Sequence, residues 1–311
     1  MPALDRLRTR IDLAQQANRP VSFAVAVGLR YRDDRVGRWA ALLGYYGFFS
    51  IFPLLLSFVT VLGIVLEGRP GLQADIVNSA LGRFPVIGRQ LGVEQLHGSP
   101  IVVAIGILAA LWAGLGVVQT LQDALNTAWS VPRGRRPSFL AKRLRSIAML
   151  LFLAVCVISA SAVTSLGTSG LRLHRVVFIL TIVASLAINI VLVGGTYRIL
   201  IRHEAPVRSL LPGAVTAGIA LFAVQAVGVL YVTRVLKNAS DTYGVFATVI
   251  GLLTWLTLQG HVVLVGNEVN VVRSGRLWPR SLRPDHPTEA DERVRRDVIA
   301  SAAASSHDHR L

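Results

Sequence analysis

Long apolar runs constrain this fold more than any other feature of the sequence. From Tyr243 to Val263 the chain contains no Asp, Glu, Lys or Arg. A bilayer core about 30 Å thick needs roughly 20 apolar residues per helical span, and several runs reach this length. Helices satisfy their own backbone hydrogen bonds in lipid, whereas a membrane β-barrel would show short alternating segments. With 53% hydrophobic and 16% charged residues, the chain is expected to be an all-α integral membrane protein.

Six apolar segments predict a bundle of six transmembrane helices. They run from about 39–66, 100–129, 146–166, 176–199, 210–232 and 243–272, with a long outer loop at 67–99. Residues 1–38 form a basic, amphipathic N-terminal segment in which Leu4, Leu7 and Ile11 share one helix face. Residues 274–311 are rich in Pro, Arg and Asp, and we expect this tail to be disordered.

The distribution of basic residues predicts the orientation of the bundle. Alternate connecting segments, with both termini, carry 25 Lys and Arg on one side and seven on the other. The positive-inside rule places the richer side, including both termini, in the cytoplasm of an inner membrane. This topology explains most of the net charge of +15 without a nucleic-acid partner.

A basic loop after the second span is predicted to face anionic lipid headgroups at the cytoplasmic leaflet. Each basic residue near such a surface contributes about 1 kcal/mol of attraction. The basic residues of this loop are Arg133, Arg135, Arg136, Lys142, Arg143 and Arg145. Membrane lipids are therefore the expected partners.

The cytoplasmic half of the second span carries a polar stripe. Gln119, Gln122, Asp123 and Asn126 fall at helical spacing on one face, which would be costly to expose to lipid. Two interpretations remain open. The stripe either forms hydrogen bonds between helices, or it lines a polar cavity.

The sixth span ends in a second polar group, Asn267, Glu268 and Asn270. An ionisable residue kept inside a span is a functional hypothesis by default. Glu268 either lies at the interface near Arg273, or it meets Asp123 and Asn126 in a shared cytoplasmic cavity, with Tyr46 at the same level. In the first span, Pro53 removes a backbone hydrogen bond and predicts a kink.

Three stretches resemble the YihY/virulence factor BrkB family of membrane proteins. They are AALLGYYGFFSIFPLLL at 40–56, LWAGLGVVQTLQDALNTAW at 111–129 and YGVFATVIGLLTWLTLQGHVVLVGNEVN at 243–270. The similar architecture covers about residues 20–273. Many relatives have Gly-Ala-Glu where this chain has Gly266-Asn267-Glu268. The resemblance implies architecture more than mechanism, and some members carry a ribonuclease BN label.

The sequence does not support that ribonuclease label. The seven histidines form no cluster with metal-ligand spacing, and no hydrolase, P-loop or dinucleotide motif occurs. The basic loops lack the interleaved aromatic residues of a single-strand binding surface. We therefore predict neither an enzyme nor a bound cofactor or metal.

The leading hypothesis is a transporter or flippase-like protein for an amphipathic or anionic substrate, such as a lipid or lipid-linked precursor. It rests on the predicted bundle, the inward polar stripe, the proline in the first span and the basic cytoplasmic surface. The alternatives are a non-catalytic envelope scaffold that binds partners and, less favoured, a membrane ribonuclease.

Overall fold

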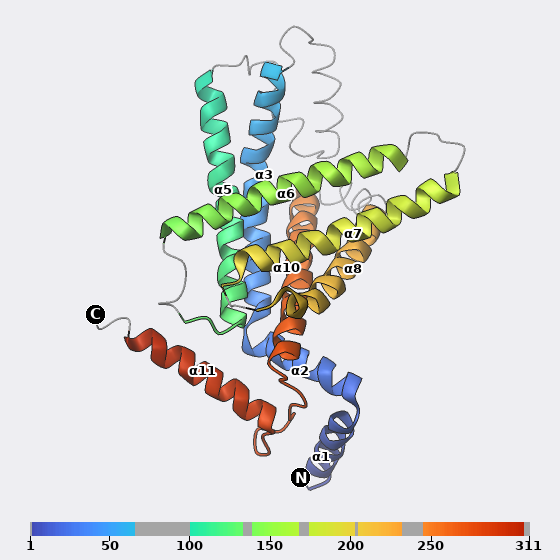
Figure 1. Cartoon of the computed structure of the whole chain (residues 1–311), viewed down its shortest axis with the longest axis vertical. Helices are drawn as coiled ribbons and strands as arrows, with labels where there is room; N and C mark the ends of the chain where they lie inside the picture. The colour runs from blue at the N-terminus through green and yellow to red at the C-terminus, as the bar shows by residue number, and fades with distance from the viewer. Residues whose placement is uncertain are drawn as a thin grey trace. The chain divides into compact units, whose positions relative to one another are not determined.

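A computed structural model describes residues 2–65, 100–132, 139–167, 174–202, 205–231 and 245–307 (Figure 1). All regular elements in these ranges are α-helices, which confirms the all-α fold class. The helices are α1 (Pro2–Ala17), α2 (Arg19–Asp33), α3 (Val36–Val65), α5 (Pro100–Ala128), α6 (Phe139–Gly167), α7 (His174–Leu200), α8 (Val207–Tyr231), α10 (Val245–Ser274) and α11 (Glu289–His307). The predicted outer loop at 67–99 lies outside the described residues.

Six of these helices coincide with the six predicted spans. Among the described residues, four segments are long and apolar enough to cross a membrane: Leu140–Ala160, Val176–Leu200, Val207–Gly228 and Val249–Ser274. Helices α3 and α5, of 30 and 29 residues, coincide with the other two predicted spans. The count of six spans and the cytoplasmic termini stay predictions.

The chain divides into two compact units, and the second consists of residues 41–118 and 226–258. In this unit, α3 packs against α10 where Gly44 faces Thr257. A Cβ atom on Gly44 would lie 2.1 Å from the Thr257 hydroxyl oxygen, so only glycine permits this approach. Small residues at such contacts are how membrane helices pack closely.

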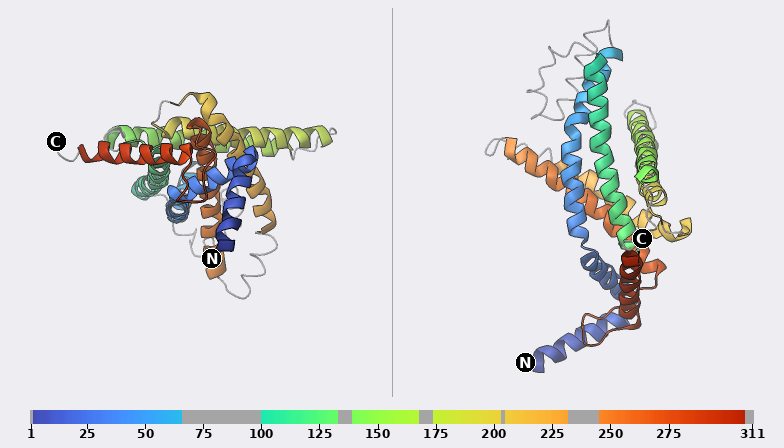
Figure 2. Two further views of the ribbon diagram at one scale, coloured as in Figure 1. Left: turned by 90° about the horizontal axis from the view of Figure 1, so that it is seen from below. Right: turned by 90° about the vertical axis from the view of Figure 1, so that its left-hand side faces the viewer.

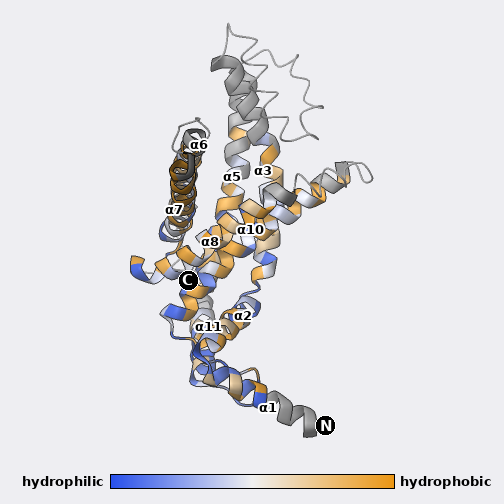
Figure 3. Cartoon of the chain, turned by 90° about the vertical axis from the view of Figure 1, so that its right-hand side faces the viewer, coloured by the Kyte–Doolittle hydropathy of each residue, from blue (hydrophilic) through white to orange (hydrophobic). Residues whose placement is uncertain are grey.

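The first unit consists of residues 1–40, 119–225 and 259–311. In it, α6 and α7 form an antiparallel hairpin and lie side by side (Figures 1 and 2). Helix α7 is predominantly hydrophobic, as the orange colour in Figure 3 indicates. The side chains of Leu151, Ile158, Phe178 and Leu180 are exposed. Such a surface is costly in water and matches the hydrocarbon interior of a bilayer.

Helix α8 packs closely against α10 and also contacts α7. A Cβ atom on Gly213 would lie 1.9 Å from the carbonyl oxygen of Gly266, so the α8 and α10 backbones nearly touch. Asn189 of α7 and Gln225 of α8 exchange hydrogen bonds of 3.1 and 3.3 Å through their amides. This pair binds the two helices together, as interhelical amides commonly do in membranes.

Helix α2 is bounded by clear local signals. Asn18 caps its N-terminus by accepting from the Val21 N–H, and Pro20 occupies the first turn, where a missing N–H costs nothing. At the other end, Arg35 adopts φ 53°, which turns the chain into α3. This turn fixes the position of Asp33 and Asp34.

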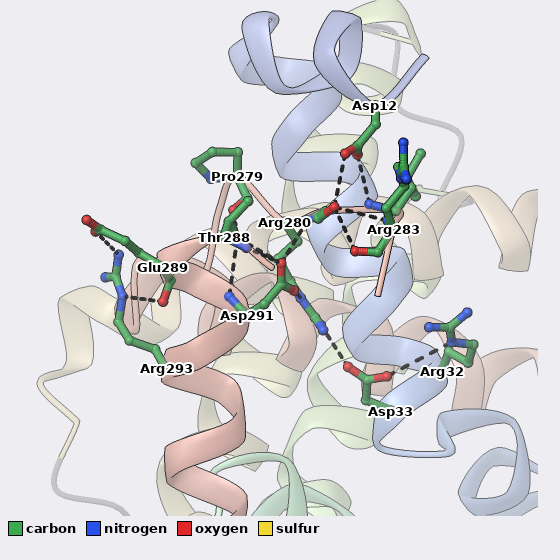
Figure 4. Close-up of polar contacts among 12 residues, drawn as sticks. Asp12, Arg32, Asp33, Pro279, Arg280, Arg283, Thr288, Glu289, Asp291 and Arg293 are labelled. Atoms are coloured by element: carbon green, nitrogen blue, oxygen red, sulfur yellow. Dashed lines mark hydrogen bonds and ion pairs between the residues drawn. The ribbon is translucent and has the colours of Figure 1, made fainter. Parts of the chain in front are cut away.

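The prediction that residues 274–311 are disordered is wrong for the described part of this tail. Residues 289–307 form α11, and Leu277 and Val294 are buried in an apolar core with Ala26, Val271 and Val272. Figure 4 shows the polar contacts that hold the segment before α11. Composition alone missed them because their partners, including Asp12 and Asp33, lie far away in the sequence.

Candidate functional site

Arg30 is the centre of the candidate site. It follows Ser22 and Ala26 on the buried face of α2, and only 3% of it is exposed. Its Nη2 donates a 2.7 Å hydrogen bond to the carbonyl oxygen of Ala128, at the end of α5. Helix C-termini carry unpaired carbonyl groups, so a buried guanidinium is a favourable partner there.

Two carboxylates approach Arg30. Its Nε lies 2.9 Å from Asp34 Oδ2 and 3.8 Å from Glu268 Oε2. Glu268 belongs to α10 and is only 1% exposed. We call Arg30, Asp34 and Glu268 the buried cluster. A single guanidinium between two desolvated carboxylates leaves one negative charge uncompensated if both are ionised.

Asp34 shows the consequence of this imbalance. Burial raises the pKa of Asp34 to about 6, and the neighbouring charge of Asp33 also raises it. Arg30, the interaction with Glu268 and Arg280 only partly oppose that rise. Asp34 therefore gains its charge close to neutral pH.

Three predicted site residues, Asn126, Asn267 and Asn270, hold helix ends together. Asn126 donates to the Leu200 carbonyl at 3.1 Å and accepts from the Arg202 N–H, which secures the end of α7. The side-chain oxygen Oδ1 of Asn267 accepts a 2.9 Å hydrogen bond from the indole N–H of Trp129. Asn270 bridges the Leu210 carbonyl and the Gly213 N–H in α8. Each of these three side-chain amides therefore makes a hydrogen bond to another helix or to its end.

Gln122 differs from these asparagines. It is 1% exposed, yet neither atom of its amide has a hydrogen-bond partner among the described residues. Asn267 Nδ2 and Glu268 Oε2 share this condition. Buried polar atoms without partners are costly, and they mark places where water or a ligand binds.

Asp123 and Glu268 have different partners in the structure. Lys142 contacts both carboxylate oxygens of Asp123, at 2.9 and 2.8 Å, and roughly a third of the Asp123 side chain is exposed. Gln119 is half-buried on the same helix. Tyr46 is exposed and belongs to the second unit, where Gly116 lies beside it. A cavity shared by Asp123 and Glu268 stays a prediction.

The predicted basic loop is partly described. Arg133, Arg135 and Arg136 lie outside the described residues. Lys142, Arg143 and Arg145 form the first turns of α6. The charge of Arg145 acts against that of Arg202 at the end of α7, and Arg145 Nη1 is buried without a hydrogen-bond partner in the described chain.

Pro53 lies inside α3, which continues helically from Val36 to Val65. The structure thus accommodates the proline within a single helix. The predicted kink at this residue stays a prediction.

The sequence analysis missed Arg30 and Asp34. A signal was present, because Arg30 occupies the small-residue face of α2 set by Ser22 and Ala26. An arginine is rarely buried unless it is paired, so an arginine on the buried face of a helix predicts a carboxylate partner. Asp34 lies one turn further along, and Glu268 is far away in the sequence.

The chain belongs to the virulence factor BrkB family, which matches residues 27–291. It is similar to YfkH of Bacillus subtilis, named a ribonuclease-like protein, with 27% identity over 85% of this chain and 98% of that protein. It is also similar to the inner membrane protein YhjD of Escherichia coli, with 23% identity over 84% of this chain and 83% of that protein. The UPF0761 membrane protein Smlt0865 of Stenotrophomonas maltophilia is 25% identical over 91% of this chain and 68% of that protein.

No solved structure matches the chain. The family and its relatives establish that the chain is a membrane protein, as the resemblance predicted. Within the described ranges, no group of three or more His, Cys, Asp or Glu side chains could hold a metal ion.

Proposed function

We propose that the chain is a multi-pass transporter or flippase-like protein of the bacterial inner membrane. Its substrate would be amphipathic or anionic, such as a lipid or lipid-linked precursor. The proposal includes six spans and cytoplasmic termini, which the uneven distribution of basic residues supports.

The observation that carries this proposal is the buried cluster at the end of α10. Glu268 lies within a segment apolar enough to cross a membrane, and it is almost fully buried beside Arg30. An ionisable group in a span costs about 2.5–3.5 kcal/mol near the bilayer centre, and less toward its edge. A protein that only needed to pack this helix end could use apolar residues at lower cost.

The guanidinium groups of Arg145 and Arg202, whose charges act on each other, support an anionic substrate or lipid partner. They lie at the ends of α6 and α7 that are connected to basic segments. Guanidinium groups bind phosphate and carboxylate groups through paired hydrogen bonds. Anionic headgroups at the cytoplasmic leaflet have this chemistry.

A reconstituted assay tests the proposal directly. Full-length protein in vesicles should accelerate the movement of a fluorescently labelled anionic phospholipid between leaflets, relative to protein-free vesicles. Glu268→Gln should abolish most of this acceleration, and Asp123→Asn should reduce it. Glu289→Gln is the matched control, because this carboxylate is 93% exposed on α11.

One result would contradict the assignment of the site, and another would contradict the transport function itself. Unchanged rates in both Glu268→Gln and Asp123→Asn would remove the site assignment. Wild-type protein that moves none of a panel of anionic phospholipids and amphipathic solutes would remove the transport function, in favour of an envelope scaffold.

A further inference from the structure

The buried cluster contains one more acid than base. Asp34 and Glu268 both interact with Arg30 and with each other. If both carboxyls were ionised, the cluster would hold a net negative charge in a nearly water-free region. Two carboxylates that share such a site cannot both ionise easily, because like charges repel and neither is well solvated.

The groups around the cluster do not remove this charge. On α2, Asp33 adds negative charge next to Asp34, although Arg280 binds Asp33 at 2.7 Å. The buried Tyr197 of α7 interacts electrostatically with Glu268. Its hydroxyl group donates its hydrogen bond to the Val263 carbonyl oxygen. From α5, the cluster meets the Ala128 carbonyl oxygen, which is also an acceptor. Arg30 is therefore the principal cation of the cluster, and Arg280 acts on it from beyond Asp33.

We infer that Asp34 and Glu268 form a proton-binding site, in which the two carboxyl groups share one proton while Arg30 balances the remaining charge. In this state the cluster is neutral: one protonated carboxyl, one carboxylate and one guanidinium. Glu268 Oε2 and Asp34 Oδ2 are both buried without a hydrogen-bond partner among the described residues, and a proton held between the two carboxyl groups satisfies them.

Loss of the proton changes the contacts between helices. The charge that appears on the second carboxyl repels the first, and Arg30 must then divide its donors between two carboxylates and the Ala128 carbonyl. Because these groups belong to α2, α10 and α5, deprotonation weakens the connection of α10 to the other two helices. The pKa of Asp34, about 6, shows that the pair exchanges a proton near physiological pH.

The use of this proton in transport rests on the proposed function, whereas proton binding does not. If the protein transports, the site supplies the coupling ion: a proton entering the pair from one side of the membrane leaves it on the other. No nucleotide or metal is required for this step. Proton binding itself can be measured without any substrate.

The test counts protons on purified full-length protein in lipid nanodiscs. Between pH 5 and pH 8, wild-type protein should release about one proton per chain more than Asp34→Asn and about one more than Glu268→Gln. Histidines titrate in the same range, but they cancel in these differences because all variants keep them. Asp285→Asn is the matched control and should release as many protons as wild type, because the hydrogen bond from Arg283 holds the pKa of Asp285 below its ordinary value.

A second measurement covers the case in which one variant fails to fold. Infrared difference spectra of the wild type between the same pH values should show a protonated carboxyl band that disappears on raising the pH. The band should be absent in whichever of the two variants folds. Equal proton release in wild type and both variants, or an unchanged carboxyl band in a folded variant, would overturn the proton site.

The transport assay separates this inference from the proposed function. Lipid movement that occurs without any response to an imposed pH gradient, together with equal proton release, would remove the proton site and leave the transporter. Proton release by the pair in a protein that moves no substrate would remove the transporter and leave the site.

Discussion

Two adjacent aspartates at the end of α2 belong to clusters of different character. Asp34 lies in the buried cluster with Arg30 and Glu268. Asp33 binds Arg280 at 2.7 Å, in a second cluster with Asp12 and Asp291 that we call the tail cluster. Both clusters contain more carboxyl groups than guanidinium groups, but the pKa of Asp34 is raised, whereas the pKa values of Asp12 and Asp291 are lowered.

Hydrogen-bond donors explain the difference. Burial alone would raise the pKa of Asp12, but bonds from the Leu282 N–H, Gln15, Ser281 and Gln16 lower it overall. Burial also acts on Asp291, and bonds from Arg280, Ser281 and Thr288 lower its pKa. Asp34 has no comparable set of donors, so burial dominates and its pKa rises. The supply of N–H and O–H groups, more than the number of cations, decides whether a carboxyl group ionises here.

The largest expected effect is that of Arg30→Met. This change leaves the Glu268 and Asp34 carboxyls without their guanidinium, and breaking a buried pair costs about 3–5 kcal/mol. Unfolding of the detergent-solubilised protein by denaturant should show this loss. The double variant Arg30→Met/Glu268→Met should recover most of it, because no charge is then stranded. Arg198→Met, at an exposed arginine, should change stability by less than about 0.5 kcal/mol. A single variant as stable as wild type would show that the buried cluster is solvated.

The next largest effect is the pH dependence of stability, which should have opposite signs in the two clusters. The folded-state pKa of Asp34, about 6, lies above its ordinary value of 3.8. Its stabilising contribution is thus present below about pH 3.8 and is lost as the pH rises through 6. The loss should be on the order of 2–3 kcal/mol for a group buried to this degree. Melting temperatures at pH 4.5 and pH 7.5 should therefore differ more for wild type than for Asp34→Asn. An equal or larger dependence in the variant would contradict the assignment.

The fold could be predicted largely from the sequence because long apolar runs have few alternatives. The six predicted spans coincide with six helices, and α3 and α10 differ from their predicted limits by a few residues at each end. The tail could not be predicted in this way. Its segment before α11 depends on Asp12 and Asp33, and no local pattern reveals a partner more than 200 positions away.

The candidate site was predictable only in part. Composition and spacing pointed to Glu268 and Gln122, which are indeed buried, but they could not show that Arg30 approaches from α2. Helical spacing placed Asp123 and Asn126 on the same polar face and did not distinguish their roles. In the structure Asn126 secures the end of α7, whereas Asp123 binds Lys142 at a half-exposed position. Tertiary contacts, which the sequence does not record, separate these roles.

Arg280→Ala tests the tail cluster and should have an intermediate effect. Arg280 donates to Asp33 at 2.7 Å and to Asp291 at 2.8 Å, and such charged bonds contribute about 1.5–3 kcal/mol when not exposed. Hydrogen exchange in α11 and in residues 277–288 should accelerate, while the buried cluster keeps its proton release. In wild type the same acceleration should occur only below about pH 4. Asp12 and Asp291 have lowered pKa values in the folded protein, so their stabilising effect is lost when they become protonated at low pH.

The control for that experiment is Arg296→Ala, at an exposed arginine of α11. It removes the same charge without removing the two contacts, and exchange should stay as in wild type. Acceleration of equal size in both variants would mean that net charge, rather than the geometry around Arg280, holds the tail.

The smallest effect is expected from Thr288→Ala, which removes the N-terminal cap of α11. The Thr288 hydroxyl and the Asp291 carboxylate exchange contacts with each other's backbone N–H groups, at 3.3 and 3.0 Å. This reciprocal arrangement is a capping box, and losing its hydroxyl costs about 1 kcal/mol. Exchange should accelerate in the first turn of α11 alone, and Thr288→Ser should restore the wild-type rate because it keeps the hydroxyl. If the alanine variant instead loosened residues 277–282 as strongly as Arg280→Ala does, the cap and the arginine would act as one cooperative unit, and the tail cluster would extend into the helix itself.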